Sequence, residues 1–336
     1  MNKITVAILD TGIDLKHSFF KNIDIEGYGY YYENGQVIKV VDCQDENGHG
    51  TECASLILNQ CKNIKIKVIK ILDSNGKTNL KILEAALIDL IETDVSIINL
   101  SLSVINKGKM DDLYSICEML INKGKIIVAS ANNRYTESYP AVFSSVIGVQ
   151  GSILTEQDEF WFNKNYKIQC VIDNNPTMVC GLKNTYKLCV KSNSHSAAKF
   201  TGMICNIMKK ANINIDNLLE KLEKRASKNI WSDNMISKSL RFPTQINEME
   251  TDRELIFKVF NIAKQNMDFS KEKGKIFQYR LLYIDKRLDG NNCYRFLRKL
   301  EKEFNIHLDY MQISRYDLLT IGTIANLIRK YIEFVN

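Results

Sequence analysis

Four short segments carry side chains that together could activate an alcohol as a nucleophile. In chain order they are residues 8–14, 48–51, 129–133 and 194–198. Between them they hold a carboxylate, an imidazole, a side-chain amide and a hydroxyl. A serine hydroxyl becomes a good nucleophile when a base takes its proton, a carboxylate orients that base, and an amide binds the developing oxyanion. The four segments therefore predict acyl-transfer chemistry if the fold brings them together.

Each segment contributes one role to this chemistry. We expect Asp10 to orient the His49 imidazole and stabilise its protonated form, and His49 to take the proton of Ser196. Ser196 is predicted to open a helix, where its backbone N–H would bind the oxyanion. The side chain of Asn133 would be the second donor, and its neighbour Asn132 is the alternative one position away. Alone, each segment also fits a plainer structure, because Asp, Asn and Ser are frequent in turns and helix caps.

The order Asp, His, Ser along the chain is the order found in subtilisin. Residues 8–14, 48–51 and 128–133 resemble the subtilisin-like serine peptidases, and the resemblance covers roughly the first two thirds of the chain. It implies a serine endopeptidase. The serine segment departs from the family's Gly-Thr-Ser-x-Ala-x-Pro, since residues 194–200 read Ser-His-Ser-Ala-Ala-Lys-Phe. This departure leaves open a second interpretation, a catalytically lapsed module that binds peptides as a scaffold.

A further segment, residues 99–103, resembles the family's substrate-binding strand. The resemblance implies that Ser101, Leu102 and Ser103 bind a peptide in extended conformation, with main-chain hydrogen bonds as in strand addition. Ser103 stands where the family usually has Gly.

Apolar runs alternate with helical patterns over the first half of the chain. This alternation predicts an α/β fold with a doubly wound, mostly parallel sheet, whose sites lie at the carboxyl ends of strands. The resemblance implies that this sheet is of the subtilisin-like type. The expected strands are 4–9, 66–72, 95–102, 125–130 and 145–149. The expected helices are 51–59, 80–93, 111–123, 196–211 and 217–228.

The polar stretch 229–251 predicts a linker, which leaves a peptidase domain over 1–228 and a small all-α domain over 252–336. Apolar residues at helical spacing predict helices in this second domain. The domain resembles acyl and peptidyl carrier domains, but Gly290 occupies the place of the serine that carries phosphopantetheine. No prosthetic arm is expected there, and the resemblance implies a docking module for a protein partner.

Composition limits the classes of partner and compartment. Nine cysteines without a CxxC pair favour reduced thiols and a cytoplasmic protein. No leader pattern and no apolar run of about 20 residues is found, so no membrane association is expected. Much of the net charge of +6 lies beyond Asp252, yet this surface gives little reason to expect nucleic acid. No acidic loop or Cys/His spacing indicates a cofactor or metal.

The combination of a subtilisin-like and a carrier-like domain resembles proteases of peptide maturation (bacteriocin-type) systems. By analogy of architecture, the expected substrate is a ribosomally made precursor peptide that loses its leader.

Overall fold

The structure is a computed structural model, and each of its two compact units is described by itself. The residues that it describes are 3–104, 108, 110–133, 137–154, 156, 158–174, 176–189, 192–211, 215–238, 252–270, 278–282 and 286–335. The first unit comprises the described residues of 1–174, 180–184 and 191–241, and the second those of 175–179, 185–190 and 242–336.

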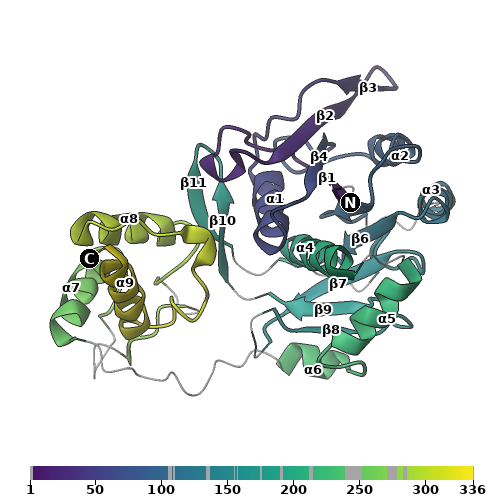
Figure 1. Ribbon diagram of the computed structural model, residues 1–336. Helices are drawn as coiled ribbons and strands as arrows, with labels where there is room; N and C mark the ends of the chain where they lie inside the picture. The colour runs from purple at the N-terminus through teal and green to yellow at the C-terminus, as the bar shows by residue number, and fades with distance from the viewer. Residues whose placement is uncertain are drawn as a thin grey trace. The chain divides into compact units, whose positions relative to one another are not determined.

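The first unit is built on a nine-stranded sheet of order β3-β2-β4-β1-β5-β6-β7-β9-β8 (Figure 1). Its central strands are parallel, and only the outer pairs β2–β3 and β8–β9 are antiparallel. The strands are β1 (Thr5–Asp10), β2 (Asp24–Glu33), β3 (Gln36–Val40), β4 (Lys65–Lys70), β5 (Ile97–Leu100), β6 (Ile126–Ser130), β7 (Ile147–Ser152), β8 (Phe160–Phe162) and β9 (Cys170–Asp173).

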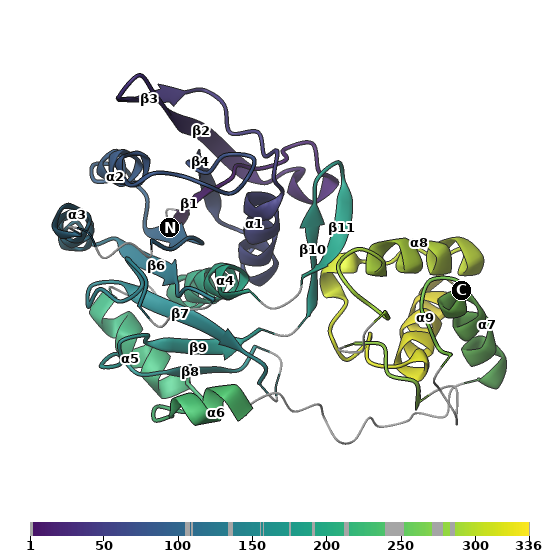
Figure 2. The same ribbon diagram turned by 180° about the vertical axis from the view of Figure 1, so that it is seen from behind.

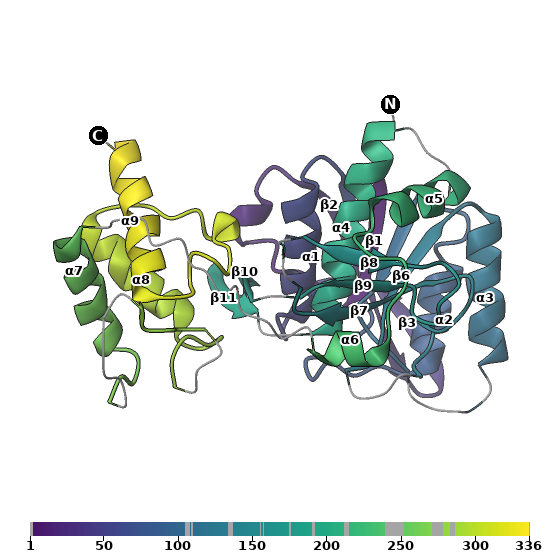
Figure 3. The ribbon, with the colours of Figure 1, turned by 90° about the horizontal axis from the view of Figure 1, so that it is seen from below.

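Helices cover both faces of this sheet, as the view from below shows (Figure 3). The helices are α1 (His49–Gln60), α2 (Leu80–Ile88), α3 (Asp111–Asn122), α4 (Asn193–Ala211), α5 (Ile215–Arg225) and α6 (Asp233–Lys238). Ala7 and Leu9 pack with α2 and α3, whereas the alternate residues Val6 and Ile8 point to the other face, where α1 and α4 lie. Burial on both faces is typical of a parallel sheet, so the predicted α/β class is confirmed.

Close backbone contact joins α1 to α4. A Cβ atom added at Gly202 of α4 would lie 2.5 Å from the carbonyl oxygen of Ile57 in α1. Only glycine permits this approach, and it lets the amino ends of both helices reach the same edge of the sheet.

One predicted boundary differs in a way that matters for the site. The sequence predicts that a helix begins at Ser196, but α4 begins three residues earlier, at Asn193. Ser194 therefore lies at the open end of the helix, while Ser196 lies inside its first turn. The antiparallel strands β2 and β3 were also not predicted, because charged and tyrosine side chains interrupt their apolar pattern.

In the described part of the second unit three helices lie together (Figure 2), and buried apolar side chains form a core of their own between them. They are α7 (Arg253–Lys264), α8 (Cys293–Phe304) and α9 (Ile321–Val335), with a 3-10 turn at Tyr310–Gln312. The helical character predicted for this region is confirmed. The unit also includes most of the hairpin strands β10 (Thr177–Gly181) and β11 (Thr185–Cys189), because Met178 and Leu188 belong to the same core. Tyr186 stacks on Tyr310 with 4.6 Å between ring centroids.

Within the part of the chain that the structure describes, no helix has both the length and the apolar character needed to cross a membrane.

Candidate active site

A buried carboxylate at the end of β1 holds the candidate base. Asp10 is 0% exposed, and its Oδ1 lies 2.8 Å from His49 Nδ1. The same oxygen accepts a 2.7 Å hydrogen bond from the backbone N–H of Thr11. Nδ1 therefore carries the proton that bonds the carboxylate, which leaves Nε2 as the basic nitrogen of the ring. The structure brings these two predicted residues together.

The glycines on either side of His49 explain how the imidazole reaches Asp10. Gly48 precedes α1 with φ of +104°, a conformation that side chains disfavour. Gly50 lies against the backbone of Gly12, since an added Cβ would be 2.2 Å from the Gly12 carbonyl oxygen. The carboxylate of Asp45 then caps the helix by accepting from the backbone N–H of Thr51 at 2.9 Å.

The two serines of the nucleophile segment have different surroundings. Ser194 is partly exposed, and its hydroxyl donates a 2.9 Å hydrogen bond to the carbonyl oxygen of Ser101. Ser196 is 1% exposed, and its hydroxyl donates to the carbonyl oxygen of Ser192 at 3.1 Å. A Cβ at Gly151 of β7 would lie 2.3 Å from Ser196 Oγ, so this hydroxyl points into the protein. The placement argues against Ser196 and in favour of Ser194 as the candidate nucleophile.

Strand register places Ser194 beside the Asp10–His49 pair. β1 and β5 are neighbours with Leu9 opposite Leu100, so Ser101 follows β5 at the level of Asp10. Ser101 in turn holds Ser194 through two hydrogen bonds, because its own hydroxyl donates to the Ser194 carbonyl oxygen at 3.1 Å. The hydroxyl of Ser194 does not bond His49 in this structure. Such bonds are often long without substrate and tighten when it binds.

Asn133 lies beside the serine turn. Its Oδ1 accepts a 3.0 Å hydrogen bond from the backbone N–H of Asn193, the first residue of α4. This bond orients the amide, whose Nδ2 carries the N–H groups that an oxyanion needs. Asn132 has a different contact, because its Nδ2 donates to the Ser103 hydroxyl at 3.1 Å. The geometry thus favours Asn133 over its neighbour as the oxyanion donor.

The predicted substrate strand continues from β5 past the serine turn. Ser101 is engaged with Ser194, and the Leu102 carbonyl oxygen accepts from Ser130 Oγ at 3.4 Å. Among the residues that the structure describes, the main-chain N–H and C=O of Ser103 have no hydrogen-bond partner. A peptide lying alongside in extended conformation could supply these partners.

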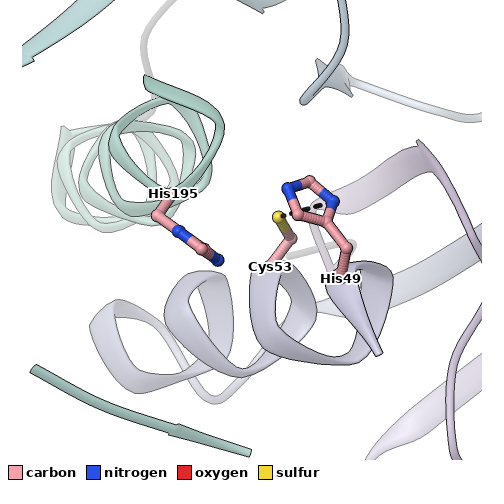
Figure 4. Close-up of side chains that lie close together, drawn as sticks. All are labelled: His49, Cys53 and His195. Atoms are coloured by element: carbon pink, nitrogen blue, oxygen red, sulfur yellow. Dashed lines mark hydrogen bonds between the residues drawn. The ribbon is translucent and has the colours of Figure 1, made fainter. Parts of the chain in front are cut away.

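Two further side chains, Cys53 and His195, lie beside the imidazole of His49 (Figure 4). Cys53 lies one turn along α1, with Sγ 3.9 Å from His49 Nδ1. The ring of His195, on α4, is 5.3 Å from the ring of His49 between centroids. His195 Nε2 is 2.8 Å from Glu52 Oε2. The spacing of four between His49 and Cys53 was the available signal, since such residues share one helix face.

Burial and neighbouring charge shift the pKa of His49 in opposite directions. Burial of the His49 ring is the largest single effect and disfavours the imidazolium, but Asp10 and Cys53 together outweigh it and raise the pKa of His49 well above its ordinary value. Burial raises the pKa of the Cys53 thiol to about 11. The thiol is therefore neutral near pH 7 and is no competing nucleophile.

Comparison with known proteins identifies the family of the chain. A model of the subtilase family (peptidase S8) matches residues 1–217, and the chain belongs to this family. The chain is 30% identical over 156 residues to the thermophilic serine proteinase of Bacillus sp. (strain AK1), which is 43% of the chain and 37% of that protein. It is 30% identical over 186 residues to the major intracellular serine protease of Bacillus subtilis (strain 168), which is 50% of the chain and 57% of that protein.

A solved structure is also similar. The chain superposes on the crystal structure of a cold adapted subtilisin-like serine proteinase with a TM-score of 0.56 and 20% sequence identity. The match covers 68% of the chain and 84% of the solved structure, and it shows the fold. The chain matches the two curated relatives over about two fifths and three fifths of their own lengths.

The protonation of His49 gives a first test. Because the nearby carboxylate favours the imidazolium, we expect His49 to titrate above the ordinary histidine value of about 6.5, and Asp10→Asn to move the titration to lower pH. The measurement is an NMR titration of the ring proton of His49 in chelator-treated protein. His49→Gln identifies its resonance among those of the four histidines. A midpoint at or below the ordinary value in the unmodified protein contradicts the assignment.

Proposed function

We propose that the chain is a serine endopeptidase that uses Ser194 as nucleophile, His49 as general base and Asp10 as the group that orients it. The side chain of Asn133 and the backbone N–H of Ser194 are the oxyanion donors. The observation that carries the proposal is the hydrogen bond between His49 and Asp10 at the end of β1. Ser101, whose carbonyl oxygen accepts from the Ser194 hydroxyl, follows the neighbouring strand β5. Membership of the subtilase family supports it.

In this reaction the Ser194 hydroxyl leaves the carbonyl oxygen of Ser101 and attacks the peptide carbonyl carbon. Its proton passes to His49 Nε2, the nitrogen that does not face Asp10. The imidazolium then gives the proton to the departing amine as the C–N bond breaks, which leaves an ester on Ser194. A water molecule, deprotonated by His49, hydrolyses the ester and restores the hydroxyl.

One observation favours the alternative of a lapsed, peptide-binding module. Ser192 stands two residues before Ser194, and its hydroxyl accepts a 3.2 Å hydrogen bond from the Ser194 backbone N–H. That N–H is the expected oxyanion donor, so Ser192 must release it before catalysis. A module that keeps this bond would still bind peptides along Ser103 without cutting them.

Labelling with a fluorophosphonate probe decides between the two serines and between the two functions. We expect one adduct per chain, lost in Ser194→Ala and His49→Ala and retained in Ser196→Ala, because the Ser194 hydroxyl is partly exposed and held by Ser101, whereas the Ser196 hydroxyl is buried. Intact-protein mass spectrometry counts the adducts and peptide mapping locates them. A folded chain without any adduct supports the lapsed module, and loss of labelling in Ser196→Ala alone restores Ser196 as the nucleophile.

The oxyanion donor is tested by substituting two neighbours. Asn133→Ala removes a hydrogen bond made to the transition state, so kcat should fall about 10²- to 10³-fold with little change in KM. Asn132→Ala is the matched control, since its side chain contacts Ser103, and we expect a smaller effect on kcat. Steady-state kinetics on a peptide substrate measures both. A larger loss of kcat in Asn132→Ala reverses the assignment.

We further propose that the substrate is a ribosomally made precursor peptide whose leader is removed in the cytoplasm, and that the second unit docks a protein partner. An intracellular relative and the absence of disulfides among the nine cysteines support the compartment. Gly290 packs against the backbone of Leu188, with an added Cβ 3.1 Å from its carbonyl oxygen. This close packing leaves little room for a side chain and argues against a prosthetic arm at this position.

The substrate class is tested with a precursor peptide encoded beside the gene. We expect the full chain to cut it once, at the junction of leader and core, and to cut unfolded casein at least about tenfold more slowly. Mass spectrometry of the products gives the site and the rate, and Ser194→Ala is the control for contaminating proteases. Digestion of casein into many short peptides at a comparable rate indicates general protein turnover instead.

A further inference from the structure

The side chains around the candidate base form a cluster of metal-ligating type. His49 and Cys53 lie one helical turn apart on α1, and His195 reaches toward them from α4 (Figure 4). Each of the three offers one ligand atom, and these atoms lie within 4.8 Å of one another. Cys53 and His195 are buried and His49 is partly exposed, so the group has one side open to solvent.

The donor set is chemically selective. Two imidazole nitrogens and one sulfur are the ligands that Zn²⁺ and similar borderline or soft cations prefer, whereas Ca²⁺ and Mg²⁺ prefer oxygen. Three protein ligands with an open fourth position are typical of zinc sites that exchange water.

Two acidic side chains complete the surroundings of the cluster. The carboxylate of Asp10 lies 2.8 Å from a ring nitrogen of His49, and that of Glu52 lies 2.8 Å from a ring nitrogen of His195. Both acids are buried. Carboxylates beside ligating histidines raise their basicity and fix their orientation, and buried negative charge favours a divalent cation.

We propose that His49, Cys53 and His195 bind one divalent cation of the Zn²⁺ class, and that the bound cation reversibly blocks the general base. The binding half of this proposal stands on the cluster alone, while the regulatory half rests on the proposed function.

Binding exchanges a proton for the metal without any redox change. Metal–nitrogen bonds form to the two imidazoles and a metal–sulfur bond forms to Cys53, whose thiol proton goes to solvent. An imidazole whose lone pair is held by a cation cannot accept the Ser194 proton. Removal of the cation by a chelator returns the ring and the thiol to their earlier state.

Cobalt provides a direct readout that needs no catalysis. The full chain is treated with EDTA, freed of the chelator and titrated with Co²⁺. We expect a near-ultraviolet sulfur-to-cobalt charge-transfer band that saturates at one equivalent and disappears when Zn²⁺ is added. In parallel, Zn²⁺ should inhibit peptide hydrolysis, and EDTA should restore it.

Two variants and one control locate the site. Cys53→Ala should abolish the band. His195→Gln should weaken the affinity for cobalt and the inhibition by zinc by about 10- to 100-fold or more. The inhibition of each variant is measured relative to the metal-free rate of that same variant. Cys43→Ala is the matched control, because Cys43 is the only one of the nine cysteines that is not buried and is the obvious rival for the metal. Circular dichroism verifies that each variant is folded.

The outcomes separate this proposal from the proposed function. A chain that hydrolyses peptides but gives no band, or a band that is lost in Cys43→Ala and kept in Cys53→Ala, overturns the metal site. If zinc inhibits the folded Cys53→Ala and His195→Gln variants as strongly as the unmodified protein, the proposal that the bound cation blocks His49 is refuted. A chain that binds cobalt as expected but cuts no peptide keeps the metal site and refutes the peptidase.

Discussion

The site exists because two helices, α1 and α4, approach to backbone distance. Gly202 allows this contact by leaving no side chain against the Ile57 carbonyl oxygen. A second close contact, Gly50 on Gly12, presses the start of α1 onto the loop after β1. Together these contacts bring an imidazole, a hydroxyl and a carboxylate from distant parts of the chain to one edge of the sheet. A methyl group at either glycine would push a helix away and separate the reacting groups.

Electrostatics then determines what this edge can do. Asp10 is fully buried, and its Oδ2 has no hydrogen-bond partner among the described residues. His49 and the Thr11 N–H, which contact Oδ1, therefore offset most of the cost of burying this charge. A buried carboxylate of this kind holds the imidazole firmly and favours its protonated form. The second acid, Glu52, lies 2.8 Å from Nε2 of His195 on the facing helix and orients that ring. The site is thus a pair of acid–imidazole couples with a serine at its margin.

Much of this arrangement could be predicted from sequence, for identifiable reasons. The central strands are continuous apolar runs, and Asp10, His49 and Asn133 lie next to glycines or at strand ends, where the pattern constrains them strongly. The serine motif can be aligned in two frames, and Ala198 fits the frame that selects Ser196, so the sequence alone favoured Ser196 over Ser194, the nucleophile that we propose. The spacing of apolar residues in the helix indicates that Ser196 is buried, because the buried stripe of Phe200, Ile204 and Ile207 extends back to Ser196.

Contacts between distant segments could not be predicted in the same way. The pairing of His195 with Glu52 depends on the crossing of α1 and α4, which one sequence does not specify. The hairpin of β10 and β11 belongs to the helical core through Met178 and Leu188, and this affiliation leaves no signal in the local sequence pattern. The strand order in the outer part of the sheet likewise depends on pairings that leave no periodic signal.

The hairpin has a topological consequence. Its stems, β10 and β11, belong to the core of one unit, while its tip at 180–184 belongs to the other, where the Lys183 N–H donates to Asp14 Oδ2 at 2.7 Å and the Cys180 N–H to Ser55 Oγ at 3.2 Å. Each unit is therefore discontinuous in sequence, and no single cut of the polypeptide yields two complete halves. The tip is held by Asp14 and Ser55, two residues far from it in the sequence, through these two hydrogen bonds.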